Sequence, residues 1–587
     1  MSFSRIILGD NPKTGILRLS IFVLTAICLS FLYLVVQFKG LNSAEAMDNA
    51  QLARNLAEGK GYVTDNIRPL SVWLFHQRDP EAKVDLEAHP DTANPPAYPY
   101  LTAFWLKVWG PKYDIPELKG DFEMYGGDWA IAVLDCILFC LGLFALFFWT
   151  ASMVDVKVAC LVAALAAFND YLWQWTISGT CWSLLFLFSV AIGWLAYVRI
   201  RSPGGGAAAL LSSVGLGLVI GIGFLTRYTF ALWLVPVLLL VLLHGGSGRV
   251  RDAVIIGAIA AAIAAPWILR NLAVTATPLG VAGYAFLGGT DLLFPGPTLL
   301  NAYQPGMDAW TIKMIARKWM TYARQMWEMD LKLIGGNWMI CFFIASSFYI
   351  FRREDLQRLK WLPVYGLLAF TAFLPPIWLP PMQGVTTQNL FSLLTPFFFI
   401  FGAVFFMVLL DRWELRSGFL RNAVMVVFVA LNSFGFLYAM LGPRIPPFRF
   451  PPYYPPVIAK AASFVKADPV SIGGSEKKMR EWMMTDMPWA VAWYGRRPAM
   501  GLTYKVDEFL KINDHEKEFS AIFLTPISSH RDLVETLING ELKEWMPVII
   551  FRSAPSNFPL KGGFPMGPDF VVLTDPARLP QEAEKPE

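Results

Sequence analysis

Two carboxylic acids, Glu45 and Asp48, lie three residues apart in a stretch that is predicted to be helical. Residues with this spacing project from one face of a helix, so the two carboxylates could share a site. One could take a proton from a hydroxyl group, and the other could help to hold a cation or orient the molecule that carries the hydroxyl. A structural role also fits, because acids in a first helical turn complement the helix dipole.

The helix that carries these acids is predicted within residues 43–62. Ser43 is a suitable N-cap and Gly59 a suitable C-terminal stop. The preceding apolar stretch, 16–38, is too long for a cleaved signal and is followed by no small-residue cleavage site, so we expect it to remain as a membrane anchor. The two acids would then stand just outside the membrane.

Two arginines lie where apolar stretches end. Arg227 interrupts the apolar run 207–244, and Arg270 follows the apolar run 252–269, beside Trp267. Each could bind a phosphate, and each could instead reach the interface as an anchor. The two would form one anion-binding clamp only if their helices are neighbours.

Several loop residues are further candidates. His76 and His89 could join Glu45 or Asp48 around a divalent metal cation such as Zn²⁺, since imidazole and carboxylate are zinc ligands, but they have no close ligand spacing and the sequence favours surface loop histidines. Asp91 is either an acceptor contact or a turn residue. The amphipathic segments 96–110 and 307–329 are predicted to lie along the membrane surface. Lys313, Arg317 and Lys318 would there meet a phosphate or form a solvated helix face.

The composition indicates the class of protein that carries these residues. The chain has 587 residues, of which 55% are hydrophobic and 16% charged, against about 25% charged in soluble domains. A purely soluble enzyme is therefore excluded, and a net charge of +4 without a long basic run argues against a nucleic-acid partner. About 20 residues per span predict eleven transmembrane helices, near 16–38, 129–150, 156–172, 179–198, 207–225, 228–244, 252–269, 333–351, 361–380, 390–410 and 422–441.

Basic residues orient these spans. They alternate between the short loops, and those on one side are predicted to be cytoplasmic: Arg5, Lys13, Arg18, Lys157, Arg199, Arg201, Arg249, Arg251, Arg352, Arg353, Arg358, Lys360, Arg412, Arg416 and Arg421. An odd number of spans sends the C-terminus outward. We therefore expect a transmembrane domain 1–442 with outer loops 39–128 and 270–332, and an extracytoplasmic remainder.

That remainder begins with a proline-rich linker, 443–456, which favours an extended spacer. Residues 457–576 are predicted to form a small α/β domain. It would have a helical start at 457–466, strands at 520–525, 547–551 and 569–573, and a helix at 530–540. The tail 577–587 is predicted to be disordered.

Five segments resemble the GT-C membrane glycosyltransferases, in particular the branch with the aminoarabinose and protein O-mannosyl transferases. In chain order they are the helix 43–62, Asn94-Pro-Pro-Ala-Tyr-Pro99, Gly221-Ile-Gly-Phe-Leu-Thr-Arg-Tyr228, Ala265-Pro-Trp-Ile-Leu-Arg-Asn271 and Thr485-Asp-Met-Pro-Trp-Ala-Val-Ala-Trp-Tyr-Gly-Arg-Arg497. The resemblance implies a GT-C-like helical fold in a bacterial inner membrane. It also implies inverting transfer of a sugar from a polyprenyl-phosphate donor to a lipid, glycan or protein acceptor on the outer face.

The resemblance carries over to particular residues. Glu45 stands where the family's first-loop acid is usual, and Asp48 remains an alternative for the same role. Arg227 and Arg270 would balance the charge of the leaving polyprenyl phosphate, and Asn94 and Tyr98 belong to the segment next to the substrate.

Two departures weaken the resemblance. Trp182 stands near the position of a family acid, and the stretch that begins at Gln388 lacks an Arg-Tyr pair. A noncatalytic homologue that binds lipid-linked glycan or scaffolds a membrane complex therefore stays an alternative. A transporter fits less well, because the sequence has no paired half-repeats and few intramembrane acids of the kind that transport sites use.

Overall fold

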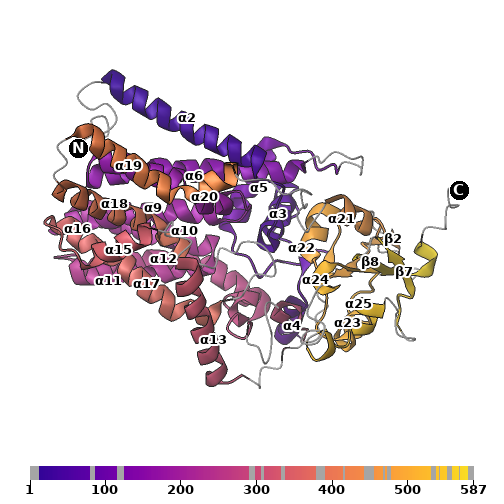
Figure 1. Cartoon of the computed structure of the whole chain (residues 1–587). Coiled ribbons are helices and arrows are strands. Elements are labelled where there is room, and N and C mark those ends of the chain that lie inside the picture. The colour runs from indigo at the N-terminus through magenta and orange to yellow at the C-terminus, as the bar shows by residue number, and fades with distance from the viewer. Residues whose placement is uncertain are drawn as a thin grey trace.

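The structure is a computed structural model that describes residues 12–79, 86–115, 124–289, 298–303, 305, 310–331, 338–378, 390–413, 417–441, 455–466, 470–471, 478–529, 537–540, 542–551, 558–566 and 569–579. Figure 1 shows a bundle of long helices in one part of the molecule and a smaller part with strands and short helices in the other. Residues from the first outer loop lie between the two parts.

The bundle contains the helices α2 (Pro12–Val36), α6 (Gly126–Met153), α7 (Val156–Ala167), α8 (Asp170–Thr176), α9 (Trp182–Arg201), α10 (Ala207–Thr226), α11 (Leu234–His244), α12 (Arg249–Thr275), α15 (Met339–Phe348), α16 (Glu354–Leu359), α17 (Trp361–Phe373), α18 (Thr395–Arg412), α19 (Gly418–Asn432) and α20 (Phe434–Leu441). Each of the eleven predicted spans is at least partly helical. Among the described residues, five helices are long and apolar enough to cross a membrane, or seven if two bent pairs each form one span. The count of eleven stays a prediction.

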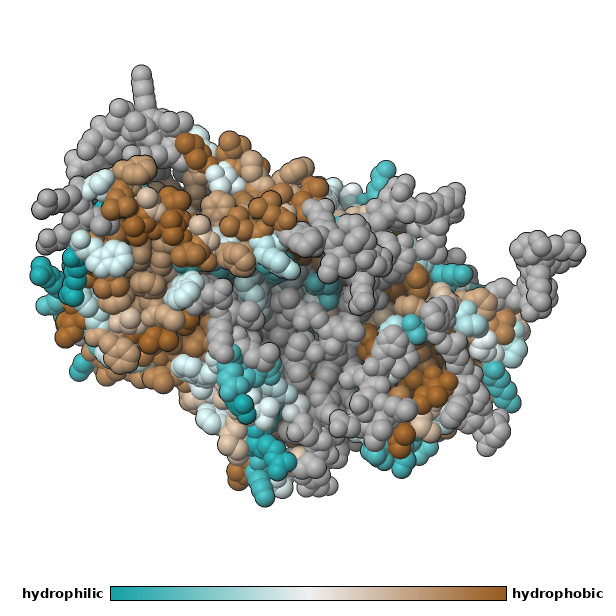
Figure 2. All heavy atoms as spheres, in the orientation of Figure 1, coloured by the Kyte–Doolittle hydropathy of each residue, from teal (hydrophilic) through white to brown (hydrophobic). Residues whose placement is uncertain are grey.

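The two bent pairs are α7 with α8 and α19 with α20, and each is bent by 61°. The first break is capped locally, because the Asn169 side chain accepts a hydrogen bond from the backbone N–H of Leu172. Figure 2 shows apolar residues over much of the visible face of the bundle, with hydrophilic residues at its left-hand end, where Figure 1 places α16. This distribution agrees with a bundle that spans a membrane.

Helices α10 and α12 approach each other closely. A Cβ atom at Gly217 would lie 2.8 Å from Cβ of Ile259, and one at Gly221 would lie 2.9 Å from Cβ of Ile263. Glycine therefore lets the two backbones pack together. The helices that precede Arg227 and contain Arg270 are thus neighbours, which was the condition for a shared clamp.

The two loops that are predicted to lie outside the membrane supply short elements between the two parts. The first loop forms α3 (Ala44–Ala57), β1 (Asn66–Ile67), α4 (Pro69–Arg78) and α5 (Ala97–Trp109), and the later loop forms η2 (Gly280–Tyr284), η3 (Thr298–Asn301), α13 (Ile312–Gln325) and the π-helix η5 (Met326–Asp330). Ser43 occupies the N-cap position of α3, and Gly59 has a positive φ of 79° just after its end. The predicted helix 43–62 is therefore confirmed, with a shorter extent.

The position of Lys318 on α13 differs from both predicted roles, a phosphate contact and a solvated helix face. Its ammonium group is buried and donates a 2.8 Å hydrogen bond to the carbonyl of Ala285. The side chain therefore faces the protein and is part of neither a solvated face nor a phosphate site. Burial lowers the pKa of Lys318 to about 7.

The C-terminal part is built on a six-stranded sheet with the order β1-β5-β4-β6-β8-β7. Its strands are β4 (Met483–Thr485), β5 (Ala499–Gly501), β6 (Ala521–Leu524), β7 (Gly562–Pro565) and β8 (Val571–Thr574), and a separate pair is β2 (Val470–Ser471) with β3 (Lys478–Met479). β1, β5, β4 and β6 run parallel, while β8 is antiparallel to β6 and β7. Because β1 comes from the first outer loop, the sheet is not built from residues 457–576 alone.

Helices flank this sheet: α21 (Pro455–Ala462), α22 (Pro488–Ala490), the π-helix η8 (Val491–Gly495), α23 (Val506–His515), α24 (Pro526–Ser529) and α25 (Met546–Phe551). The predicted helical start at 457–466 and the strands at 520–525 and 569–573 are confirmed in α21, β6 and β8. The predicted strand at 547–551 is wrong, because these residues form α25. Pro547 lacks the N–H that a strand ladder needs but fits a first helical turn.

The remaining predictions concern the ends of this part. The predicted disordered tail begins inside a 3-10 helix, η10 (Pro576–Arg578), and Arg578 donates to both carboxylate oxygens of Glu481 at 2.7 and 2.8 Å. The start of the tail is therefore ordered. Residues 580–587, most of the linker 443–456 and most of the predicted helix 530–540 lie outside the described residues.

Candidate functional site

The first acid, Glu45, lies in the first turn of α3 and pairs with the predicted phosphate-binding arginine. Nη1 of Arg227 lies 3.2 Å from Oε1 of Glu45, and the two side chains are 15% and 13% exposed. Arg227 is the extended residue, with φ −152° and ψ 122°, that ends α10. The thiol of Cys181 lies 3.9 Å from the same carboxylate oxygen. The structure therefore brings the predicted acid and the predicted guanidinium together.

The second acid, Asp48, is buried and lies in a different environment. Its carboxylate accepts hydrogen bonds from four side chains: Asn66 (2.7 Å), Asn94 (2.6 Å), Gln51 (3.3 Å) and Arg68. A carboxylate has about four acceptor positions, so these donors occupy it fully. Asp48 thus fastens α3 to the rest of the first loop.

Asp91 completes this network from the other end of the loop. Its carboxylate accepts from the backbone N–H groups of Ala93 (2.8 Å) and Asn94 (2.7 Å) and from Arg68 (3.5 Å). Burial raises the pKa of Asp91 above its ordinary value, an effect that Arg68 opposes and the neighbouring Asp48 reinforces. Of the two roles considered for Asp91, the turn residue is the one that the structure shows, and its side chain is buried.

Arg270 lies beside this turn. Its Nη1 donates to the carbonyl of Asp91 at 2.5 Å and to Oδ1 of Asn271 at 3.0 Å, and its guanidinium lies over the rings of Trp267 (4.6 Å) and Tyr62 (5.6 Å). Within the described part of the chain, its Nε and Nη2 have no hydrogen-bond partner. They remain able to bind an anion.

A tyrosine links the ends of the two arginine-bearing helices. The hydroxyl of Tyr228, the residue after Arg227, accepts hydrogen bonds from Trp267 Nε1 at 2.8 Å and Asn271 Nδ2 at 3.3 Å. Tyr228, which follows Arg227, is thus joined directly to Trp267 and Asn271 beside Arg270.

Tyr98, a predicted substrate contact, is buried. Its hydroxyl donates to the carboxylate of Asp135, at 3.0 and 3.1 Å, and lies 3.3 Å from the carbonyl of Gly179. Gly179 has a φ of 75°, and a Cβ there would lie 2.2 Å from Leu41, so this turn requires glycine. The turn holds Cys181 against Glu45, which makes Tyr98 a support for the site.

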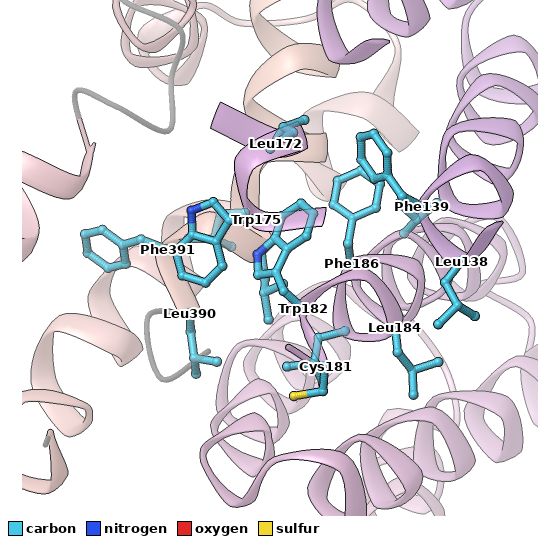
Figure 3. Packing of buried hydrophobic residues seen from close by; sticks show 14 of the residues in the cluster. Leu138, Phe139, Leu172, Trp175, Cys181, Trp182, Leu184, Phe186, Leu390 and Phe391 are labelled. Atoms are coloured by element: carbon cyan, nitrogen blue, oxygen red, sulfur yellow. The ribbon is translucent and has the colours of Figure 1, made fainter. Parts of the chain in front are cut away.

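The position near which a second acid was expected is apolar. Trp182 is buried, stacks on Phe186 with ring centres 5.2 Å apart, and donates through Nε1 to the Ser392 hydroxyl at 2.9 Å. Figure 3 shows Trp182 among Trp175, Phe186 and other apolar side chains. Burying a carboxylate in these apolar surroundings would be costly unless a partner compensated its charge.

The predicted metal ligands are not brought together. Nε2 of His89 lies 2.9 Å from the Ser71 hydroxyl, and His76 pairs with Glu516 of the C-terminal part at 2.6 Å. Within the described residues, no three His, Cys, Asp or Glu side chains form a group that could hold a metal ion. Because the donors around Asp48 occupy its oxygens, the residues as arranged do not fit a metal site.

A contact that the sequence did not indicate fixes α3 to the C-terminal part. Buried Arg54 donates to the carbonyls of Ala492 and Trp493, both at 2.6 Å, and its guanidinium lies 5.0 Å from the Trp493 ring. Asp128 accepts from Trp493 Nε1 and from the Tyr494 hydroxyl, both at 2.7 Å. The helix that carries Glu45 is therefore held from two sides.

Sequence reasoning also missed Arg68 and Asn66, which bind Asp48, and Asp135, which binds Tyr98. Arg68 had a usable signal, because it is a cation in the same outer loop as the acids. Asn66 had none, since an asparagine in a loop fits most environments. Asp135 stands alone in an apolar span, a position where an ionisable residue is costly unless it is paired.

The chain has the fold of solved structures of an aminoarabinose transferase and of an oligosaccharyltransferase. Among solved structures, the chain is similar to ArnT from Cupriavidus metallidurans bound to undecaprenyl phosphate, with a TM-score of 0.54, 12% identity, and coverage of 94% of this chain and 97% of that chain. It is also similar to the oligosaccharyltransferase AglB from Archaeoglobus fulgidus in complex with an inhibitory peptide and a dolichol-phosphate, with a TM-score of 0.52, 12% identity, and coverage of 96% and 75%.

A structure of the Archaeoglobus fulgidus oligosaccharyltransferase with zinc and sulfate has a TM-score of 0.52 to this chain, 11% identity, and coverage of 87% and 68%. No family model and no curated protein matches the sequence. At identities near 12%, these similarities show the fold alone. The expected resemblance to the GT-C enzymes is confirmed at the level of the fold.

Proposed function

We propose that this chain is an inverting glycosyltransferase that moves a sugar from a polyprenyl-phosphate donor to a hydroxyl-bearing lipid, glycan or protein on the outer face of the membrane. The observation that carries this proposal is the contact of Glu45 with Arg227 at the outer end of the bundle. A base and a phosphate-binding cation side by side are what such a transfer requires. Neighbours bound to undecaprenyl phosphate and dolichol-phosphate support the donor class.

Glu45 is the better base of the two acids. Its side chain is 13% exposed and lies against Arg227, whereas the carboxylate of Asp48 is buried and is bonded to four side-chain donors. In the reaction, the acceptor oxygen attacks the anomeric carbon while the bond from that carbon to the phosphate oxygen breaks. Glu45 takes the acceptor proton, and the leaving polyprenyl phosphate carries away the bonding electrons and the negative charge.

Arg227 and Arg270 balance that charge. Arg227 is bound to Glu45 in the resting structure, so a donor phosphate that binds Arg227 competes with the carboxylate and releases it to act as a base. Arg270 is already oriented by Asp91 and Trp267, with Nε and Nη2 directed to no described partner. Donor binding thereby prepares the base in the same step.

Asp48, Asp91, Asn94 and Tyr98 act as positioning residues in this proposal. Their polar groups bond to one another, to Arg68 or to Asp135, and all four side chains are buried. They hold α3 and the 91–94 turn at fixed positions beside the two arginines. The use of a divalent cation stays a prediction, because the described residues contain no group of metal ligands. No step above depends on such a cation.

The alternative is a noncatalytic protein that binds lipid-linked glycan. It is favoured by one observation, the apolar surroundings of Trp182 where a second acid was expected. The test uses purified protein and radiolabelled polyprenyl-phosphate sugars, and measures donor binding and transfer separately. Glu45→Gln should bind donor without transfer, and the matched control Glu58→Gln, at the exposed end of the same helix, should keep both. Donor binding without transfer by the wild type, across a panel of acceptors, would favour the alternative.

A further inference from the structure

A cavity lies in the bundle, between α7 and the bent pair α19–α20. It has a volume of about 750 Å³, within the range of ligand pockets, and none of its lining residues belongs to the site around Glu45. The side chains along it are mainly apolar, among them Leu161, Ala164, Val426 and Val429. The cavity is therefore a separate, lipid-facing groove.

The two helix breaks close one end of this groove. Phe168 lies at the bend between α7 and α8, Ser433 lies at the bend between α19 and α20, and both residues line the cavity. The other end is marked by Lys157 and Asn422, at the starts of α7 and α19. From Lys157 to Phe168 the groove runs for about 16 Å along α7, close to the roughly 15 Å depth of one leaflet.

A cation, Lys157, lies at the open end of the groove. Among the described residues, Lys157 has no ion pair, whereas the nearby Arg421 is paired with Asp411 at 2.5 Å. Lys157 is exposed and precedes an apolar helix, where an ammonium group can meet a lipid phosphate. A positive mouth and an apolar interior are complementary to an anionic lipid.

We propose that this groove binds one chain of an anionic phospholipid, with the phosphate at Lys157 and the acyl chain between α7 and α19. The depth of the groove fits a chain that spans one leaflet, and a polyprenyl chain is much longer than one leaflet. The site therefore differs from the donor site around Arg227 both in position and in the length of lipid that it takes. By the predicted orientation, Lys157 faces the cytoplasm, so the lipid belongs to the inner leaflet.

The test is native mass spectrometry of the full chain released from nanodiscs that contain equal amounts of phosphatidylglycerol and phosphatidylcholine. The wild type should retain one phosphatidylglycerol in preference to phosphatidylcholine. Lys157→Gln should lower that preference about fivefold, the effect of one lysine near an anionic lipid. Val426→Trp, which fills the groove, should abolish retention. The matched control is Leu211→Trp on α10, because Leu211 is 70% exposed, Val426 is 68% exposed, and Leu211 does not line the groove.

Three results would overturn the inference. The first is Val426→Trp protein that retains the lipid as the wild type does. The second is equal retention of both phospholipids by the wild type. The third is displacement of the retained phospholipid by added undecaprenyl phosphate in the wild type and in Leu211→Trp, which would assign the groove to the donor lipid. Melting temperatures of the variants show that they are folded, and the exposed positions of Lys157 and Val426 favour this.

Discussion

Replacing Asp48 by asparagine separates the roles of the two acids of α3. Asp48 is buried, and among the described residues its partner Arg68 has one other carboxylate nearby, Asp91 at 3.5 Å. Breaking a buried ion pair from one side costs roughly 3–5 kcal/mol. Asparagine keeps one acceptor oxygen but turns an amide toward donors such as Asn66 and Asn94, so we expect a loss of about 3 kcal/mol.

Glu45→Gln should behave differently. Its ion pair with Arg227 consists of one contact at 3.2 Å between partly exposed groups, so the loss should be about 1 kcal/mol or less. Loss of a general base, however, lowers the transfer rate by roughly 10² to 10⁴. Asp48→Asn should therefore lower mainly the stability of the protein, and Glu45→Gln should lower mainly its transfer rate.

The assay is thermal unfolding of detergent-purified protein, read by tryptophan fluorescence, together with transfer of a radiolabelled sugar. Asp48→Asn should unfold about 5 °C or more below the wild type, whereas Glu45→Gln should unfold close to it and lack transfer. A stable Asp48→Asn protein without transfer, or a Glu45→Gln protein with normal transfer, would refute the assignment of base and anchor.

Three further predictions concern other parts of the site. Arg54→Met should lower the unfolding temperature and increase hydrogen exchange at residues 491–495, because two buried carbonyls lose their charged donor. Arg270→Lys should weaken binding of undecaprenyl phosphate about tenfold in a direct binding assay, since lysine cannot keep both the stacking on Trp267 and the remaining donors. Burial lowers the pKa of Lys318 from 10.5 to about 7, so the unfolded chain binds more protons between these values. The stability of the wild type should therefore rise from pH 7 to pH 9, more steeply than that of Lys318→Met in the same unfolding assay.

The sequence predicted the kinds of residue in the site better than their contacts. Glu45 and Arg227 were recognised because an acid and an arginine at the outer ends of apolar stretches are unusual. Their pairing depends on how the end of α10 lies against α3, which spacing along the chain does not determine. The close approach of α10 and α12 was likewise open, although Gly217 and Gly221 mark the surface where it occurs.

The two acids looked equivalent in the sequence because only their shared helix face was visible. The structure distinguishes them through Arg68, Asn66 and Asn94, which reach Asp48 from other segments of the loop. Such long-range donors have no local pattern. Asn94 was predicted as a substrate contact from the resemblance of its segment, and its bond to Asp48, across 46 residues, could not be seen in the sequence.

The C-terminal sheet shows two further limits. β1 has two residues, Asn66 and Ile67, which pair with Ala499 and Met500 more than 430 positions later, and a strand this short carries no periodicity. The apolar run 547–551 fitted a buried strand and a helix equally by composition. Only Pro547 favoured the helix that is observed.

The central claim is that the contact of Glu45 with Arg227 forms the donor phosphate site. The most direct measurement is a cryo-electron microscopy structure of the full chain with bound undecaprenyl phosphate. The account predicts the phosphate within hydrogen-bond distance of Arg227, with the Glu45 carboxylate displaced from its present 3.2 Å contact. A phosphate bound elsewhere, with the contact of Glu45 and Arg227 intact, would contradict it.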